Sequence, residues 1–185
     1  MNEWWLSLPT LLDQVWLRLG RGVVDRKADA RHPTFATVGS SGAEARIVVL
    51  RHADRAQTTL SVYGDLRAGK IQDLMQDPRA SILVWEQKTK LQIRLRVHVE
   101  IRSGDAVAHH WQRVPERAKA VYGSKPAPGT PIDQPENLME HGRPEAFAVL
   151  VCTIKEIEAL YLGSDLHRRA KFSLDTKWVG LWLAP

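Results

Sequence analysis

The sequence predicts a mainly β protein, an antiparallel β-barrel with a few helical additions. Two observations lead to this prediction. Short β-rich segments separated by turn-forming residues recur from residue 34 towards the C-terminus, and one of them, Lys90 to Ile101, alternates strictly between apolar and polar side chains. A period of two places the apolar side chains on one face of a strand and the polar ones on the other. Many short strands with only small helices between them favour a barrel.

The length of 185 residues favours one domain, 1–185, in which residues 1–30 form an N-terminal helical extension. No apolar run reaches the roughly 18–20 residues of a membrane helix, and the start of the chain lacks a basic segment and a cleavage site of a secretory signal. The single cysteine, Cys152, excludes an intramolecular disulfide and a cysteine metal cage. We therefore expect a cytoplasmic protein with no membrane partner and no metal.

The chain carries 26 basic and 21 acidic residues, a formal net charge of +5. A basic β-barrel that binds nucleic acid is one interpretation of this excess. The basic residues are scattered rather than grouped in a tail or a long run, which favours one small anionic ligand and an otherwise solvated surface. We therefore expect no nucleic-acid partner, although steep salt dependence of DNA binding would indicate one.

Local patterns place the individual elements. Ser7 is the expected N-cap of a first helix whose apolar positions run to Leu19 and which Gly20 and Gly22 end. Two further helices are expected at 70–77 and, with Asp105 as N-cap, at 105–114. The proline- and glycine-rich segment 123–131 must be a loop. The expected strands are 34–38, 46–50, 58–62, 81–85, 90–101, 147–154 continued by 156–162, 167–172 and 178–183.

Residues 65–70, Asp-Leu-Arg-Ala-Gly-Lys, form a basic turn that leads into the second helix. Backbone N–H groups at a helix N-terminus and the helix dipole favour a phosphate, and Arg67 and Lys70 add positive charge. The residues alone leave two interpretations open, a phosphate site and an exposed basic turn, and exposed basic turns are the more common of the two.

The order of the motifs favours the phosphate site. Arg46-Ile-Val-Val-Leu-Arg51 is followed by Val62-Tyr63, by Asp65-x-Arg67-x-x-Lys70 and by Gln92 in the string Leu-Gln-Ile-Arg-Leu. Pro126-Ala-Pro-Gly-Thr-Pro131 and Tyr161-x-Gly163…Leu166-His167-x-Arg169 come next. This ordered set resembles the pyridoxamine 5'-phosphate oxidase family of FMN-binding split barrels, and within it the oxidase-related group more than the oxidase itself. The resemblance covers roughly residues 30 to 185.

The resemblance implies an FMN site shared between the two subunits of a homodimer. It assigns the FMN phosphate to Arg46 and Lys70, a place in the phosphate pocket to Tyr63, and an approach to the isoalloxazine ring to Gln92. It also implies that Arg169 reaches the flavin from the partner chain. The other candidates for the cofactor are the backbone of Val48 and Val49, and Arg51, Arg67 and Tyr161; the candidates for the substrate are His167 and Arg113.

The chain departs from the oxidase at several of its characteristic positions. Ala68 and Gly69 stand where the oxidase has a hydroxyl and an Arg, and Asp165 stands where the oxidase has an Arg that faces the substrate. The segment 110–117 has no clean match to the residues that grip the substrate phosphate. The resemblance therefore implies an FMN-dependent oxidoreductase that acts on a small molecule. It does not support pyridoxamine phosphate as that substrate. The alternative is a non-catalytic FMN carrier or sensor.

Overall fold

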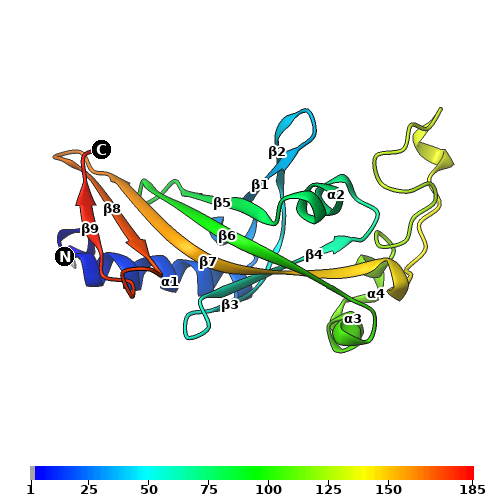
Figure 1. Ribbon diagram of the computed structural model, residues 1–185, viewed down its shortest axis with the longest axis horizontal. Helices are drawn as coiled ribbons and strands as arrows, with labels where there is room; N and C mark the ends of the chain where they lie inside the picture. Colours follow the sequence, from blue (N-terminus) through cyan, green and yellow to red (C-terminus); the bar gives the residue numbers. More distant parts are fainter. Residues whose placement is uncertain (1–2) are drawn as a thin grey trace.

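The computed structural model describes residues 3–185 as one nine-stranded antiparallel sheet with helices around it (Figure 1). The sheet runs in the order β2-β1-β5-β6-β7-β4-β3, while β8 pairs with β7 and β9 pairs with β8. This architecture confirms the predicted mainly β, antiparallel fold class. The strands are β1 (Thr34–Gly39), β2 (Gly42–Ile47), β3 (Leu50–Asp54), β4 (Thr59–Asp65), β5 (Arg79–Glu86), β6 (Leu91–Ser103), β7 (Phe147–Leu162), β8 (His167–Ser173) and β9 (Leu181–Leu183).

The two strands at the ends of the sheet's path, β2 and β3, are consecutive in the chain. Only Val48 and Val49 separate β2, which pairs with β1, from β3, which pairs with β4. The expected strand 46–50 is therefore wrong, since this segment is the junction between two strands. The barrel interior is filled with fully buried apolar side chains from β1 and from β3 to β7, among them Phe35, Leu50, Leu60, Val62, Ile82, Ile93, Leu95 and Leu150.

The two longest strands, β6 and β7, run side by side through the molecule. In β6 the predicted alternation is confirmed, because Leu91, Ile93 and Leu95 are buried and the residues between them face outward. β7 unites the two expected segments in a single strand of 16 residues. A bulge at Lys155 shifts its register with β6. The first half of β7 pairs with β4 and its second half with β8, so this strand spans both ends of the molecule (Figure 1).

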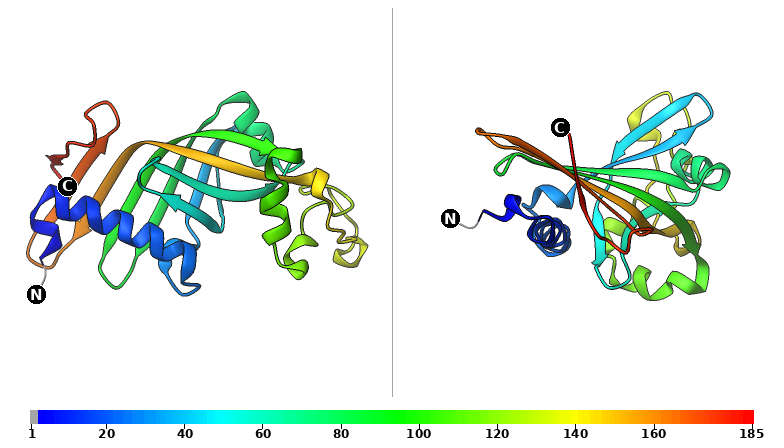
Figure 2. Two further views of the ribbon diagram at one scale, coloured as in Figure 1. Left: turned by 90° about the horizontal axis from the view of Figure 1, so that it is seen from below. Right: turned by 60° about the vertical axis from the view of Figure 1, so that its left-hand side comes forward.

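The first helix, α1 (Leu8–Val24), begins as predicted, because the side chain of Ser7 accepts a hydrogen bond from the backbone N–H of Thr10. It does not end at Gly20 or Gly22. A Cβ on Gly22 would lie 2.7 Å from the backbone carbon and oxygen of Ala30. The glycine therefore permits close packing of the following segment against the helix, a tertiary requirement that resembles a stop signal in sequence. The helix lies along one side of the sheet and packs against β3 and β7 (Figure 2).

The remaining helices are short. They are α2 (Gly69–Gln76), α3 (Ala108–Arg113), α4 (Glu116–Lys119), and the 3-10 turns η1 (Trp4–Leu6), η2 (Asp29–Arg31), η3 (Gly104–Val107), η4 (Pro135–Asn137) and η5 (Pro144–Ala146). Two expectations are thus corrected. Asp105 lies inside η3 and caps no helix, and the last strand keeps only three residues because positive φ angles at Lys177 and Trp178 bend the chain before it. Within residues 3–185, no helix is long and apolar enough to cross a membrane.

The long loop between α4 and β7 is fastened to the barrel at Asp65. This carboxylate, 5% exposed, accepts hydrogen bonds from the backbone N–H and the guanidinium of Arg67 and from the backbone N–H of Gly123. Arg67 also donates to the carbonyl oxygen of Ser124 at 2.8 Å. Burial by itself raises the pKa of Asp65, but these hydrogen bonds outweigh it and hold the pKa below the usual value.

We predict that Asp65→Asn lowers the free energy of unfolding by about 1–3 kcal/mol at neutral pH, because buried N–H donors lose a charged acceptor. Urea unfolding measures this loss. Asp133→Asn, at an exposed position of the same loop, is the control and should change stability by less than about 0.5 kcal/mol. Because the folded-state pKa of Asp65 is lowered, its contribution is present above the ordinary Asp pKa and is lost as the pH falls through the folded value. The two curves should therefore converge in acid.

Candidate functional site

Arg46 lies near the end of β2 and faces the barrel interior. It stands opposite Phe35 of β1, which is fully buried. Its Nη1 donates to the hydroxyl oxygen of Thr37 at 2.6 Å, and that hydroxyl in turn donates to Asp73 of α2 at 2.6 Å. Its Nη2 lies 3.7 Å from Asp73 Oδ2, beyond a normal hydrogen bond. The guanidinium is therefore held in place by one of its ends and keeps N–H donors for another acceptor.

Lys70, in the first turn of α2, is half-buried beside this arginine. Burial lowers its pKa first, the positive charge of Arg46 lowers it further, and Asp65 opposes the shift. A Cβ on Gly64 would lie 3.1 Å from Lys70 Cε and 3.5 Å from its Nζ, so the glycine makes room for the lysine. In the described part of the chain, no carboxylate lies within 4.0 Å of Nζ. Two adjacent, partly desolvated cations favour an anion, and the residues here fit a phosphate group.

Val48 and Val49 follow Arg46 directly and link β2 to β3. Val48 is buried, and its backbone N–H donates to the carbonyl oxygen of Pro33 at 3.1 Å. Val49 is half-buried and lies outside both strands. The predicted flavin-edge segment is therefore irregular backbone next to the cation pair, between two strands that hold it at both ends.

Arg51 and Tyr63 come together on the outer wall of β3 and β4. The Arg51 guanidinium lies 5.2 Å from the centre of the Tyr63 ring, and the Tyr63 hydroxyl lies 3.2 Å from Nδ1 of His110 in α3. Because successive residues of a strand face opposite sides, Tyr63 points away from Lys70, which lies over Gly64. The structure therefore does not bring Tyr63 and Lys70 together in one phosphate pocket.

The two remaining basic candidates of this region have different surroundings. Arg67 is engaged by Asp65 and Ser124 as described above, and it serves the loop rather than the Arg46–Lys70 pair. Arg113 ends α3, and its positive charge acts on Tyr63 and His110. Burial first, and then the charges of the neighbouring basic groups, lower the pKa of His110.

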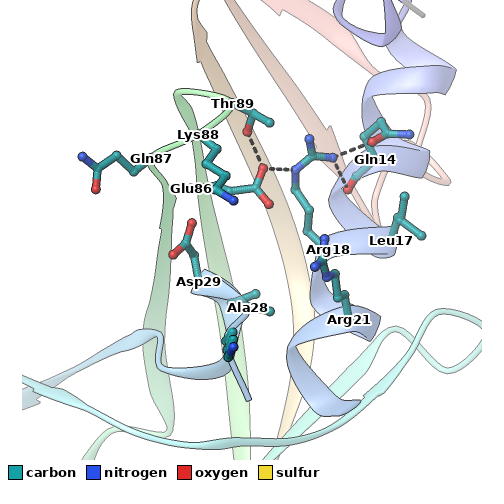
Figure 3. A pocket seen from close by; sticks show the side chains of 12 residues that line it. Gln14, Leu17, Arg18, Arg21, Ala28, Asp29, Glu86, Gln87, Lys88 and Thr89 are labelled. Atoms are coloured by element: carbon teal, nitrogen blue, oxygen red, sulfur yellow. Dashed lines mark hydrogen bonds and ion pairs between the residues drawn. The ribbon is translucent and has the colours of Figure 1, made fainter. Parts of the chain in front are cut away.

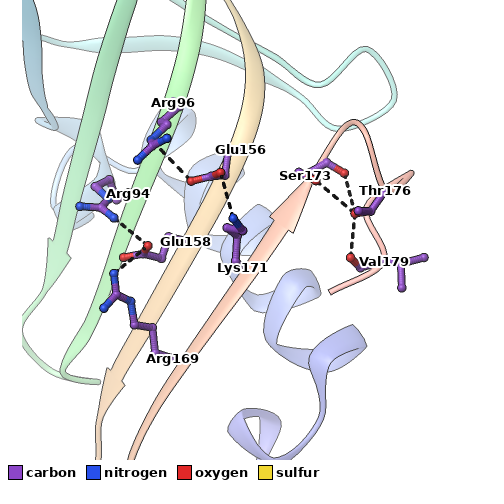
Figure 4. Close-up of polar contacts among 9 residues, drawn as sticks. All are labelled: Arg94, Arg96, Glu156, Glu158, Arg169, Lys171, Ser173, Thr176 and Val179. Atoms are coloured by element: carbon purple, nitrogen blue, oxygen red, sulfur yellow. Dashed lines mark hydrogen bonds and ion pairs between the residues drawn. The ribbon is translucent and has the colours of Figure 1, made fainter. Parts of the chain in front are cut away.

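A second group of candidates lies on the outer face of the sheet. Gln92 of β6 stands opposite Leu160 of β7, which stands opposite Arg169 of β8. Directly opposed residues share a face, so the Gln92 amide and the Arg169 guanidinium lie in one row. Arg169 Nη2 donates to Glu158 Oε2 at 3.0 Å (Figure 4). His167 is exposed at the beginning of β8 and shares this face.

Tyr161 belongs to a different cluster. Its ring is stacked on Trp5 at 4.8 Å between centroids, with an interplanar angle of 15°, and meets the edge of Trp4 at 5.4 Å. It stands opposite buried Leu91 and therefore points to the inner face, away from Gln92 and Arg169. The structure does not unite Tyr161 with that row. Leu160, not Tyr161, is the residue of β7 that lies in the row of Gln92 and Arg169. The alternation of side chains along the strand decides this, and the spacing of the motif does not reveal it.

The two groups are far apart within one chain. Arg46 faces the barrel interior from β2, whereas Arg169 faces outward from β8. Five strand-to-strand steps separate β2 from β8 along the curved sheet, a path of about 24 Å at ordinary strand spacing. Within one chain, the two groups thus lie on opposite faces of the sheet and on strands that are not neighbours.

A cavity of about 600 Å³ lies between α1, residues 27–30 and the hairpin that joins β5 to β6 (Figure 3). Sequence reasoning did not find it, and none of the predicted site residues lines it. Its floor holds Arg18, a buried residue that donates Nε to Glu86 and Nη1 to the side chain of Gln14. The Arg18 guanidinium also lies 4.7 Å from the centre of the Trp4 ring. These contacts join the N-terminal helix to the hairpin.

Comparison with known proteins identifies the class of protein, a split barrel that binds a flavin. Residues 13–103 match the family described as pyridoxamine 5'-phosphate oxidase, FMN-binding domain. This match over residues 13–103 supports the predicted resemblance to the pyridoxamine 5'-phosphate oxidase-related FMN-binding family, and it supports FMN as the cofactor. A search of curated proteins finds no significant match.

Solved structures share the fold. A pyridoxamine 5'-phosphate oxidase-related, FMN-binding protein from Nostoc punctiforme is 22% identical, with a TM-score of 0.77 over 94% of this chain and 96% of that chain. PhzG from Burkholderia lata, in complex with tetrahydrophenazine-1-carboxylic acid, is 20% identical, with a TM-score of 0.79 over 100% and 97%. General stress protein 26 from Bacillus anthracis is 12% identical, with a TM-score of 0.53 over 79% and 93%.

We predict that Arg46→Ala and Lys70→Ala each weaken FMN binding about ten- to hundredfold, because each removes charge-assisted hydrogen bonds to the phosphate. Fluorescence titration measures the affinity. Riboflavin, which lacks the phosphate, should bind both variants as it binds the wild type. Lys27→Ala, at an exposed position, is the control. Unchanged FMN affinity in both variants would contradict the assignment.

The affinity for FMN should also fall in alkaline solution. The phosphate is a dianion above pH ~7, since its second pKa is about 6, so the phosphate itself does not titrate over this range. Because the pKa of Lys70 is below its usual value, the attraction weakens as the pH rises through that lowered pKa, earlier than for an ordinary lysine. Lys70→Arg keeps its charge over this range. Its pH profile should be flat, and a wild-type profile equally flat is the contradictory result.

Proposed function

We propose that the protein is an FMN-dependent oxidoreductase that acts on a small molecule, with two FMN sites at the interface of a homodimer. Arg46 and Lys70 of one chain bind the phosphate, and Gln92 and Arg169 of the partner approach the flavin ring. The observation that carries this proposal is that the two groups lie on opposite faces of the sheet in one chain, five strand-to-strand steps apart along it. A second copy is the simplest source of the missing half.

In this function, FMN supplies the redox chemistry, and the protein binds and orients it. Arg46 and Lys70 hold the anionic end, and Asp73 and Thr37 keep the Arg46 guanidinium in position. The amide of Gln92 offers both a donor and an acceptor for ring heteroatoms. Arg169 places a fixed positive charge on the same face, where it favours an electron-rich ring edge.

The outer face of the sheet also suits a second copy. Large apolar side chains lie exposed on it beside the Gln92 row, with Leu83 and Trp85 of β5 at 36% and 44% exposure. Leu181 of β9 is 43% exposed. Exposed apolar residues around partly satisfied arginines are typical of a surface that another protein surface covers.

The substrate is proposed only as a small molecule, and pyridoxamine 5'-phosphate is not assigned. Asp165, which stands in place of a substrate-facing Arg, is ion-paired with Arg168 at 3.0 Å. PhzG from Burkholderia lata binds tetrahydrophenazine-1-carboxylic acid. This supports the proposal that the substrate of this protein differs from pyridoxamine 5'-phosphate. His167 and Arg113 remain the proposed substrate contacts.

The departures at these positions favour one second candidate, a flavin carrier or sensor without catalysis. Anaerobic mixing of the FMN-loaded protein with NADH or NADPH separates the two. Bleaching of the flavin absorbance near its visible maximum within seconds supports the oxidoreductase. The carrier is supported if NADH and NADPH do not reduce the bound flavin and if the flavin, once chemically reduced, does not pass its electrons to a small-molecule acceptor.

We predict that two defective chains restore one another. Arg46→Ala and Arg169→Ala chains each lack one half of every site in their own homodimers and should hold little FMN. After subunit exchange, a heterodimer contains one site with both halves intact and one with neither. Mixing should therefore recover about half of the wild-type flavin content per heterodimer, measured by absorbance after gel filtration. No recovery after confirmed exchange would mean that each site is built within one chain.

A further inference from the structure

A buried carboxylate lies between two arginines on the outer face, next to the Gln92 row. Glu158 of β7 is 5% exposed. Its Oε2 accepts from Arg94 Nη2 at 2.7 Å and from Arg169 Nη2 at 3.0 Å (Figure 4). Burial by itself raises the pKa of Glu158, but the hydrogen bonds from the two arginines outweigh it and keep the pKa below its usual value. The carboxylate is therefore charged at neutral pH.

The two arginines are only partly satisfied by this carboxylate. Each contributes one Nη2 to it, and the Nε of both Arg94 and Arg169 is buried without a hydrogen-bond partner in the described chain. About a third of each side chain is exposed, 38% for Arg94 and 31% for Arg169. The group of three carries a net charge of +1. An incompletely satisfied ion-pair group is costly for a chain that stays alone, which points to a further acceptor at this place.

A second group on the same face provides an internal comparison. Glu156 lies between Arg96 at 3.5 Å and Lys171 at 3.6 Å (Figure 4). It has the same net charge and stands one row further from Gln92. Its contacts are longer than hydrogen bonds, and none of its members is among the buried unpaired atoms. Only the Glu158 group is built to fix the direction of its arginines.

We propose that Glu158 is a positioning residue that orients Arg169 towards the partner's flavin, and that Arg94 is a second cation of the same ring-binding surface. The inference rests on the proposed function and deepens it. Glu158 fixes one edge of the Arg169 guanidinium, so that its remaining N–H groups keep one direction. Arg94 stands opposite Glu158 and two residues from Gln92 on the same face of β6, so the amide and both guanidinium groups form one polar surface.

Positioning and plain electrostatics predict opposite signs for Glu158→Gln. Removing the negative charge raises the net charge of the group from +1 to +2, which by itself tightens the binding of an electron-rich ligand. Loss of the anchor lets Arg169 rotate and weakens the binding. Glu156→Gln is the matched control, since it removes the same charge from the same face without touching Arg94 or Arg169.

The experiment titrates the full-length wild type, Glu158→Gln, Glu158→Ala and Glu156→Gln with FMN and with riboflavin, and records the visible spectrum and melting temperature of each. We expect Glu158→Ala to weaken both flavins about ten- to hundredfold and Glu158→Gln about tenfold, with a shifted visible band of the bound ring. Glu156→Gln should stay within about twofold of the wild type. The equal loss for FMN and riboflavin distinguishes a ring contact from the phosphate contact of Lys70.

If Glu158→Ala does not fold, Glu158→Gln alone tests the same idea, because its neutral amide weakens the anchor of Arg169 while the higher net charge by itself favours an electron-rich ligand. It should still lose about tenfold. Flavin affinities unchanged or increased in the folded Glu158 variants overturn the inference, even when Lys70→Ala behaves as predicted. A wild-type protein that binds neither flavin overturns the proposed function itself.

Discussion

The pairing of β6 with β7 is the constraint on which the rest of the structure depends. All 13 residues of β6 have partners in β7. Because side chains alternate along both strands, the register that buries Ile93 and Leu95 in the barrel also sends Gln92 and Arg94 to the outer face. The core and the proposed ring-binding surface are therefore two sides of one set of backbone hydrogen bonds. A shift by one residue would expose the first and bury the second.

Both halves of the candidate site are places where positive charge is incompletely satisfied. Arg46 and Lys70 are adjacent cations at the end of the barrel, and burial together with Arg46 lowers the pKa of Lys70. On the outer face, Arg94 and Arg169 share one buried carboxylate. By contrast, Arg67 donates to the carbonyl oxygen of Ser124 and Arg18 donates to Glu86 and Gln14, and these bonds join segments of the chain. The arginines that join segments of the chain thus differ from Arg94 and Arg169, whose buried Nε groups have no partner in the described residues.

Much of the fold was predictable from local pattern. The alternation in 90–101 identified β6, and Ser7 identified the beginning of α1. The errors occurred where a residue serves a distant contact. Gly22 permits the approach of Ala30 and was mistaken for a helix end. The segment 46–50 has the composition of a strand but connects two strands, because β2 pairs with β1 and β3 pairs with β4, and local propensity does not specify these partners.

The sequence by itself determined the chemistry that is present: the ordered motifs that indicate FMN, the cations at Arg46, Lys70 and Arg169, and the amide at Gln92. Only the tertiary structure decided which of these meet. It placed Lys70 beside Arg46, turned Tyr63 to the other side of β4, and sent Tyr161 to the inner face against Trp5. It also joined Arg169 to Glu158, a residue that carries no motif. The physical reason is that strand pairing sets both face and register, and partners in a sheet are separated by many residues in sequence.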